Sequence, residues 1–163
     1  MSKTQATLMV WWPKAHEHNK TEDEGRTLRV RYEVHAPGGK LHGGEEPLAA
    51  LPKDLPCLVL AAPSEVSLFA VVPPKLSGNK LKDALPFLVE PFLLNEPEEN
   101  HVTLWGKLAA GEAGSKLSAV ISKAHARAVV ASCRKAGLKL LGISCETLRE
   151  PVGNAPVAWF SGD

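Results

Sequence analysis

Three groups of residues carry the side chains that metal binding or catalysis requires. His16, Glu17 and His18 are adjacent, so two imidazoles could contact one metal ion. A zinc site takes three or four protein ligands, however, and no further ligand lies near these residues in the sequence. The polar, mixed-charge stretch of residues 13–26 is typical of a solvated turn, and we predict a flexible loop there.

The second group combines a thiol with a base. Cys133 could serve as a nucleophile and His101 as its general base. Cys133 falls on the apolar face of a predicted helix, however, where a buried thiol is inert. His101 opens a predicted strand, where a capping or packing role is the ordinary one.

The third group consists of Glu96, Glu98 and Glu99, which could act as paired carboxylates. Glutamates in a proline-containing loop are usually solvated charges. Nothing in the chain assembles a nucleophile, a base and oxyanion donors. Gly38-Gly39-Lys40 also lacks the spacing and the Ser or Thr of a phosphate-binding loop. We therefore predict no catalytic, cofactor-binding or metal-binding residue.

Composition describes an ordinary globular chain. The 163 residues carry a formal net charge of +1, with 44% hydrophobic and 23% charged residues, so nothing favours nucleic acid as a partner. The three cysteines, Cys57, Cys133 and Cys145, are widely spaced in apolar runs, which predicts reduced core thiols. No stretch approaches the ~18 apolar residues of a membrane span, and no signal peptide is recognisable. We expect this chain to be soluble and cytoplasmic.

The elements that would position these residues alternate between strands and helices. Leu28, Val30, Tyr32 and Val34 alternate with charged residues, which predicts a strand with one buried face. Six further apolar runs predict strands at residues 7–12, 57–62, 66–72, 102–105, 116–121 and 138–145. Glycines and charges over residues 36–47 predict a flexible connection, followed by a short helical turn at 48–51. The order predicts an α/β fold, a mixed sheet with helices packed on it.

Two segments have helical periodicity. Residues 122–136 begin with an N-capping Ser122 and end before Gly137, with a predicted buried stripe of Ala126, Val129, Val130 and Cys133.

In residues 81–94, one face carries an apolar stripe, and prolines interrupt the segment at 86 and 91. The stripe consists of Leu81, Ala84, Leu85, Leu88 and Phe92. We predict a short bent helix, either kinked if it starts at Asn79 or regular only from about Asp83. In either case Phe87 is turned partly outward.

The second of these segments and its surroundings resemble a known family. The runs VPPKLS at 72–77, KLKDALPFLVE at 80–90 and EPEENHV at 96–102 look like the type II secretion system protein L family. Residues 131–146 also fit, and VAWFSGD at 157–163 resembles the first strand of a second actin-like half. The resemblance covers about residues 56 to 163 and is poor from 12 to 55.

This resemblance implies an RNase H-like, actin-like cytoplasmic domain of a scaffold at the cytoplasmic face of the bacterial inner membrane. The family continues into a second actin-like half, a transmembrane helix and a periplasmic domain. We accordingly expect residues 1–150 to form the actin-like domain, with 13–26 and 36–47 as loops. Residues 151–163 would be a linker and the start of a truncated second half.

The family's role implies partners rather than a cofactor. The expected partners are the N-terminal domain of the secretion ATPase and other inner-membrane platform proteins, with a homodimer as a further option. Phe87, Glu90, Glu96, Glu98 and Glu99 are the residues we expect to bind a partner.

Two alternatives stay open. One is a related pilus-assembly scaffold that binds ATP. Actin-like ATPases need backbone donors and small residues after the first strand, whereas this strand ends in Trp11-Trp12-Pro13-Lys14. The other is an RNase H-like metal-dependent enzyme, which needs clustered strand-end carboxylates, and Glu33 stands without a second acidic residue in its strand.

Overall fold

The computed structural model describes residues 6–15, 17–18, 27–107 and 114–148. It divides into two compact units, one of residues 1–65 with 128–163 and one of residues 66–127. Each unit has its own sheet and its own core. The prediction of one domain over residues 1–150 stays a prediction, and residues 151–163 lie outside the described residues.

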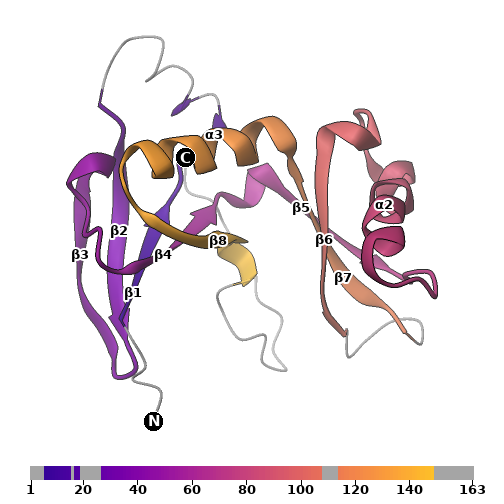
Figure 1. Ribbon diagram of the computed structural model, residues 1–163, viewed down its shortest axis with the longest axis horizontal. Helices are drawn as coiled ribbons and strands as arrows, with labels where there is room; N and C mark the ends of the chain where they lie inside the picture. The colour runs from indigo at the N-terminus through magenta and orange to yellow at the C-terminus, as the bar shows by residue number, and fades with distance from the viewer. Residues whose placement is uncertain (1–5, 16, 19–26, 108–113, 149–163) are drawn as a thin grey trace. The chain divides into compact units, whose positions relative to one another are not determined.

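A five-stranded mixed sheet forms the first unit, in the order β3-β2-β1-β4-β8 (Figure 1). β1 pairs antiparallel with β2 and parallel with β4, and β8 pairs parallel with β4. The strands span Thr7–Trp11 (β1), Arg29–Ala36 (β2), Gly39–Pro47 (β3), Pro56–Ala61 (β4) and Lys139–Cys145 (β8). The predicted mixed sheet is confirmed, and the expected helical turn is the 3₁₀ segment Leu48–Ala50.

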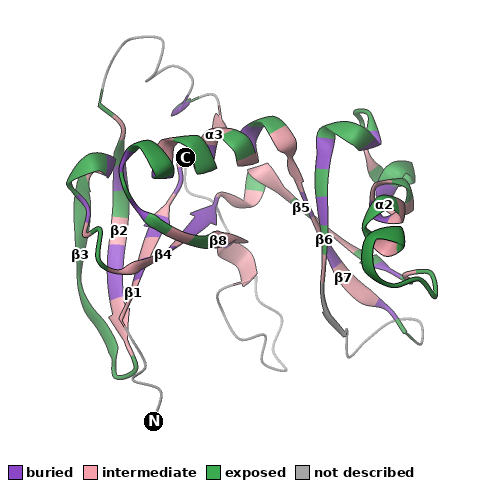
Figure 2. Cartoon of the chain, in the orientation of Figure 1, coloured by how far each residue is buried: buried purple, intermediate pink, exposed green. Residues whose placement is uncertain are grey.

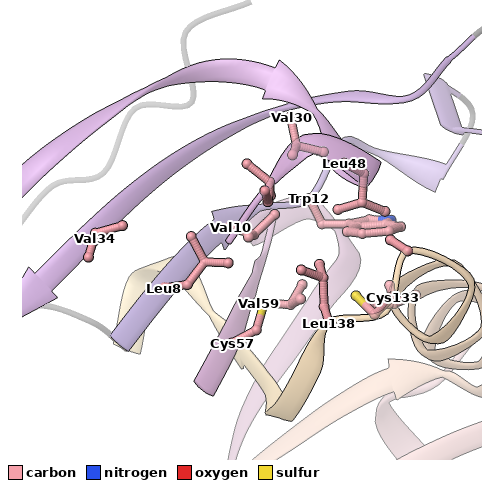
Figure 3. Close-up of a cluster of buried hydrophobic side chains, with 13 residues drawn as sticks. Leu8, Val10, Trp12, Val30, Val34, Leu48, Cys57, Val59, Cys133 and Leu138 are labelled. Carbon is pink, nitrogen blue, oxygen red and sulfur yellow. The ribbon is translucent and has the colours of Figure 1, made fainter. Parts of the chain in front are cut away.

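Helix α3, Lys123–Lys135, contributes to the core of this unit. Val129 and Cys133 are fully buried. Figure 3 shows Cys133 beside strand residues of the same core such as Leu8 and Val59. Val130 is 37% exposed, so its predicted place in the buried stripe is wrong. Successive helical residues are about 100° apart, which turns Val130 away from the face that Val129 buries. Ala126 is only half-buried.

The ends of α3 follow the predicted signals. The amide of His125 donates to the Ser122 hydroxyl at 3.5 Å, as expected of an N-cap. At the other end Gly137 has a φ of 75°, and the Leu138 amide donates to the Cys133 carbonyl at 3.0 Å. A left-handed glycine that closes a helix in this way is the expected C-terminal stop.

The loop predicted over residues 36–47 is wrong from residue 39 onward. Gly39–Pro47 form β3, which pairs antiparallel with β2 along its whole length, with a register shift between Val34 and His35. The strand lies at the edge of the sheet and is exposed almost throughout, so it lacks the apolar alternation by which strands are recognised (Figure 2).

The loop predicted over residues 13–26 is wrong at residues 15, 17 and 18, which are helical, whereas residues 13 and 14 have no regular structure. The amides of Glu17 and His18 donate to the Lys14 carbonyl at 3.0 Å, which forms a turn of helix. His18 is only 2% exposed, and its ring lies 5.4 Å from that of Trp12. Burial against an aromatic ring, not solvation, therefore determines the place of His18.

The described residues of the second unit form an antiparallel sheet of three strands, in the order β5-β7-β6, together with helix α2 and the first residues of α3 (Figure 1). Its core joins Val71, Val102 and Val120 of the sheet to Leu85 and Val89 of the helix. The elements span Val66–Val71 (β5), Gly78–Val89 (α2), Asn100–Lys107 (β6) and Lys116–Ser122 (β7).

Candidate partner-binding surface

Helix α2 contains Pro86 in its interior, because it begins at Gly78 and not near Asp83. Pro86 has no amide hydrogen, so the Lys82 carbonyl lacks the donor that a regular helix would supply. The helix stops at Val89, and Glu90–Phe92 continue as a 3₁₀ turn that holds Pro91. The helix is therefore little more than three turns long, with Pro86 inside it and Pro91 just beyond its end.

The two faces of α2 differ as the helical spacing predicts. Leu85 is buried, with Leu81 and Leu88 packed beside it, as the predicted stripe requires. Val89, which the predicted stripe did not include, is also fully buried. Phe87 is 56% exposed, which confirms that it is turned outward, and the exposed Glu90 follows it on the same side at i+3.

Phe92 is 57% exposed, so its predicted place on the inner face is wrong. The 3₁₀ turn has three residues per turn, and the wheel of an α-helix does not apply to it. The Phe92 ring stacks on Phe69 of β5, with 5.2 Å between the ring centroids.

The glutamates at 96, 98 and 99 lie in a loop with defined hydrogen bonds. Pro97–Glu99 form a 3₁₀ turn that contacts α2, and Pro97 itself is buried. The buried Asn100 donates to the Glu96 carbonyl at 3.1 Å and to the Asn95 side-chain oxygen at 3.0 Å. The Lys123 ammonium donates to the Glu98 carbonyl at 2.7 Å.

The structure thus brings the five predicted partner-binding residues into one unit and leaves all of them exposed. Glu98 and Glu99 belong to the 3₁₀ turn that contacts α2, and Glu96 directly precedes that turn. Within the described part of the chain, no Lys or Arg forms a salt bridge with Glu90 or with these three residues. Whether they bind a partner stays a prediction.

The end of β1 is the place where an actin-like ATPase would hold phosphate. Here the Lys14 amide donates to the carboxylate of Glu17 at 3.3 Å, and the Ala15 amide donates to that of Glu65 at 3.1 Å. Donors that would face an anionic ligand are therefore directed at carboxylates of the chain itself.

The candidate nucleophile Cys133 has a different environment from that of a reactive thiol. Its side chain is fully buried, and burial raises its pKa to about 11. Burial, followed by the charge of Cys133, raises the pKa of Cys57 to about 12. Cys57, Cys133 and Cys145 are all buried and free of disulfides, as predicted.

A polar cluster on the first sheet was not predicted. Glu33 of β2 is only 6% exposed, and its carboxylate accepts from His35 at 2.8 Å, Lys40 at 3.1 Å and Arg31 at 3.2 Å. A hollow of about 330 Å³ lies beside it, lined by Arg31, Tyr32, Glu33, Lys40, Gly43, Gly44 and Glu45. The alternation in β2 is enough to predict that Arg31, Glu33 and His35 share one face of the strand. The contact of Lys40 with Glu33 could not be predicted, because Lys40 lies in β3, which was expected to be a loop.

The described residues contain no group of three or more His, Cys, Asp or Glu side chains arranged to hold a metal ion. None of their helices has the length and apolar character needed to cross a membrane.

Comparison with known proteins gives a likeness in structure but not in sequence. No protein-family profile and no curated protein matches the chain. The cytoplasmic domain of EpsL, an inner-membrane component of the type II secretion system of Vibrio cholerae, superposes with a TM-score of 0.69 at 15% identity. The fold is actin-like. This confirms the predicted fold class.

The shared region covers 91% of this chain and 60% of the EpsL chain, so the sequence spans about three fifths of that domain. The type IV pilus biogenesis complex of PilM and PilN also matches, with a TM-score of 0.55, 14% identity, and coverage of 86% of this chain and 47% of that chain. Both solved structures carry the predicted α/β architecture.

Proposed function

We propose that this chain is part of a non-catalytic scaffold at the cytoplasmic face of a bacterial inner membrane, in a type II secretion platform. The likeness to the EpsL domain over 91% of the chain carries this proposal. The sequence of residues 80–102 supports it as well, because this segment resembles the type II secretion system protein L family independently of the fold.

The scaffold would recruit the secretion ATPase by binding its N-terminal domain. The proposed binding surface is the exposed side of the second unit, formed by Phe87 and Glu90 with the turn of Glu96, Glu98 and Glu99. A protruding aromatic side chain beside charged residues is typical of the anchor of a protein interface. Other platform proteins and a second copy of the chain are further proposed partners.

Titration calorimetry with the ATPase's N-terminal domain tests recruitment. We expect a saturable complex at micromolar concentrations, because interfaces built around a few anchors reach this range. Absence of a heat signal, together with separate elution of the two proteins in gel filtration, would overturn the proposed recruitment.

A pilus-type scaffold that binds ATP is the second candidate, because PilM also shares the fold. The hydrogen bonds that the backbone amides after β1 donate to the carboxylates of Glu17 and Glu65 argue against it. In an ATP-binding protein of this kind, these amides would donate to phosphate oxygens instead. Titration with Mg-ATP separates the two. We expect no binding, and a saturable signal would move the assignment to the pilus type.

A further inference from the structure

The segment of residues 83–99 combines negative charge with exposed apolar side chains. It contains five acidic residues and no Lys, Arg or His, in a chain whose formal net charge is +1. All five acidic side chains are exposed: Asp83, Glu90, Glu96, Glu98 and Glu99. Across residues 27–107 and 114–148 no basic side chain forms a salt bridge with any of them. The charge of this segment is therefore available to a partner.

Three large apolar side chains project from the same segment. Phe87 and Phe92 are 56% and 57% exposed, and Leu94 is fully exposed. None of the three belongs to the hydrophobic core of the second unit. Contiguous exposed apolar surface rimmed by polar residues marks interaction sites, whereas single exposed apolar side chains are common on any surface. Three such side chains within eight residues make this segment a candidate.

Prolines and a few contacts also restrict the conformation of the segment. Pro86, Pro91 and Pro97 restrict its backbone, and the stacking of Phe92 on Phe69 fixes one of the exposed rings. The hydrogen bonds of Asn100 fix the loop that returns to α2. A surface that is ordered before binding loses less conformational entropy when a partner arrives.

We infer that residues 83–99 bind a basic, amphipathic segment of a partner protein, an inference that rests on the proposed scaffold function. Its apolar residues would cover Phe87, and its Lys and Arg side chains would face the uncompensated glutamates. We do not expect nucleic acid or anionic lipid to bind this surface, because their phosphates would be repelled by carboxylates of the same charge.

The two parts of the surface should have separate kinetic effects. Rim charges mainly steer association, so neutralising Glu96, Glu98 and Glu99 should slow the association rate and reduce its salt dependence. A desolvated aromatic anchor mainly determines the lifetime of a complex, so Phe87→Ala should speed dissociation.

Surface plasmon resonance with the ATPase's N-terminal domain as the probe measures both effects. The variants are Phe87→Ala and the triple substitution E96Q/E98Q/E99Q. Matched controls come from β3 in the other unit: Leu41→Ala removes an apolar side chain that is 63% exposed, and E45Q/E46Q removes two exposed charges. Circular dichroism and thermal melts check that every variant is folded.

For the unaltered chain we expect Kd to rise about tenfold between 50 and 300 mM salt, since exposed charges are screened within roughly 10 Å at 0.1 M. Phe87→Ala should raise Kd about tenfold or more through the dissociation rate. The control variants should leave Kd within about twofold.

Failure of the inference and failure of the proposed function give different results. If the complex forms but its Kd changes neither with salt, nor with the triple substitution, nor with Phe87→Ala, the inference is wrong and the proposed recruitment is unaffected. Absence of any complex with the unaltered chain overturns both.

Discussion

The carboxylate of Glu33 lies 2.8 Å from Nε2 of His35, two residues along the same strand. Both side chains are on the face of β2 that also presents Arg31, and Lys40 reaches them from β3. The hydrogen bond from His35, then those from Lys40 and Arg31, outweigh burial and lower the pKa of Glu33 from 4.5 to about 2. The ionised carboxylate thus ties the edge strand β3 to the sheet.

This cluster predicts a loss of stability in acid. Because the pKa of Glu33 is lower in the folded chain, its contribution is present above pH 4.5 and is lost as the pH falls from 4.5 towards 2. Urea unfolding at pH 7, 4 and 3 measures it. Glu33→Gln should lower the free energy of unfolding at pH 7 by about 1–3 kcal/mol and weaken the acid dependence. An equal acid slope in both proteins would contradict the assignment.

Gly43 should not tolerate a side chain, whereas its neighbour should. A Cβ at Gly43 would lie 2.6 Å from the Tyr32 carbonyl oxygen and 2.9 Å from Cγ of Glu33. At Gly44 the nearest atom would be Cε1 of Tyr32 at 3.7 Å, an ordinary contact. We expect Gly43→Ala to cost about 1–3 kcal/mol and Gly44→Ala less than about 0.5 kcal/mol in thermal unfolding. Equal melting temperatures would rule out the close approach of β2 and β3.

Val129 and Val130 are a matched pair on α3. Val129 is fully buried and Val130 is 37% exposed. Val129→Ala should leave a cavity and destabilise the chain by about 2 kcal/mol, whereas Val130→Ala should stay within about 0.5 kcal/mol. Chemical denaturation of both variants checks this, and the reverse order would mean that α3 packs on its other face.

The buried thiols should be slow to react in the native chain. Burial raises the pKa of Cys133 to about 11 and that of Cys57 to about 12, so very little thiolate exists at pH 8. A chromogenic disulfide reagent at pH 8 should label these thiols only after denaturant is added. Rapid labelling of the native protein at either residue, located by mass spectrometry, would contradict their burial.

Periodicity by itself determined most of the strands and helices and both faces of α2. The alternation in residues 28–34 and the helical spacing of Leu81, Leu85 and Leu88 are local properties, and burying the apolar residues leaves one way to orient each element. The outward direction of Phe87 followed from this spacing. So did the inert character of Cys133, because its place on the apolar face implied burial.

Only the tertiary structure decided the rest. β3 has almost no apolar residue, and pairing with β2, not its own pattern, makes it a strand. Lys40 meets Glu33 only through that pairing, and His18 is buried only because Trp12 and α3 cover it. Phe92 leaves the inner face because a tighter turn follows Val89. For β3, Lys40 and His18 the decisive partner lies in another segment of the chain, and contacts between segments, not spacing along one of them, set the final position. For Phe92 the change is local, from an α-helix to a 3₁₀ turn.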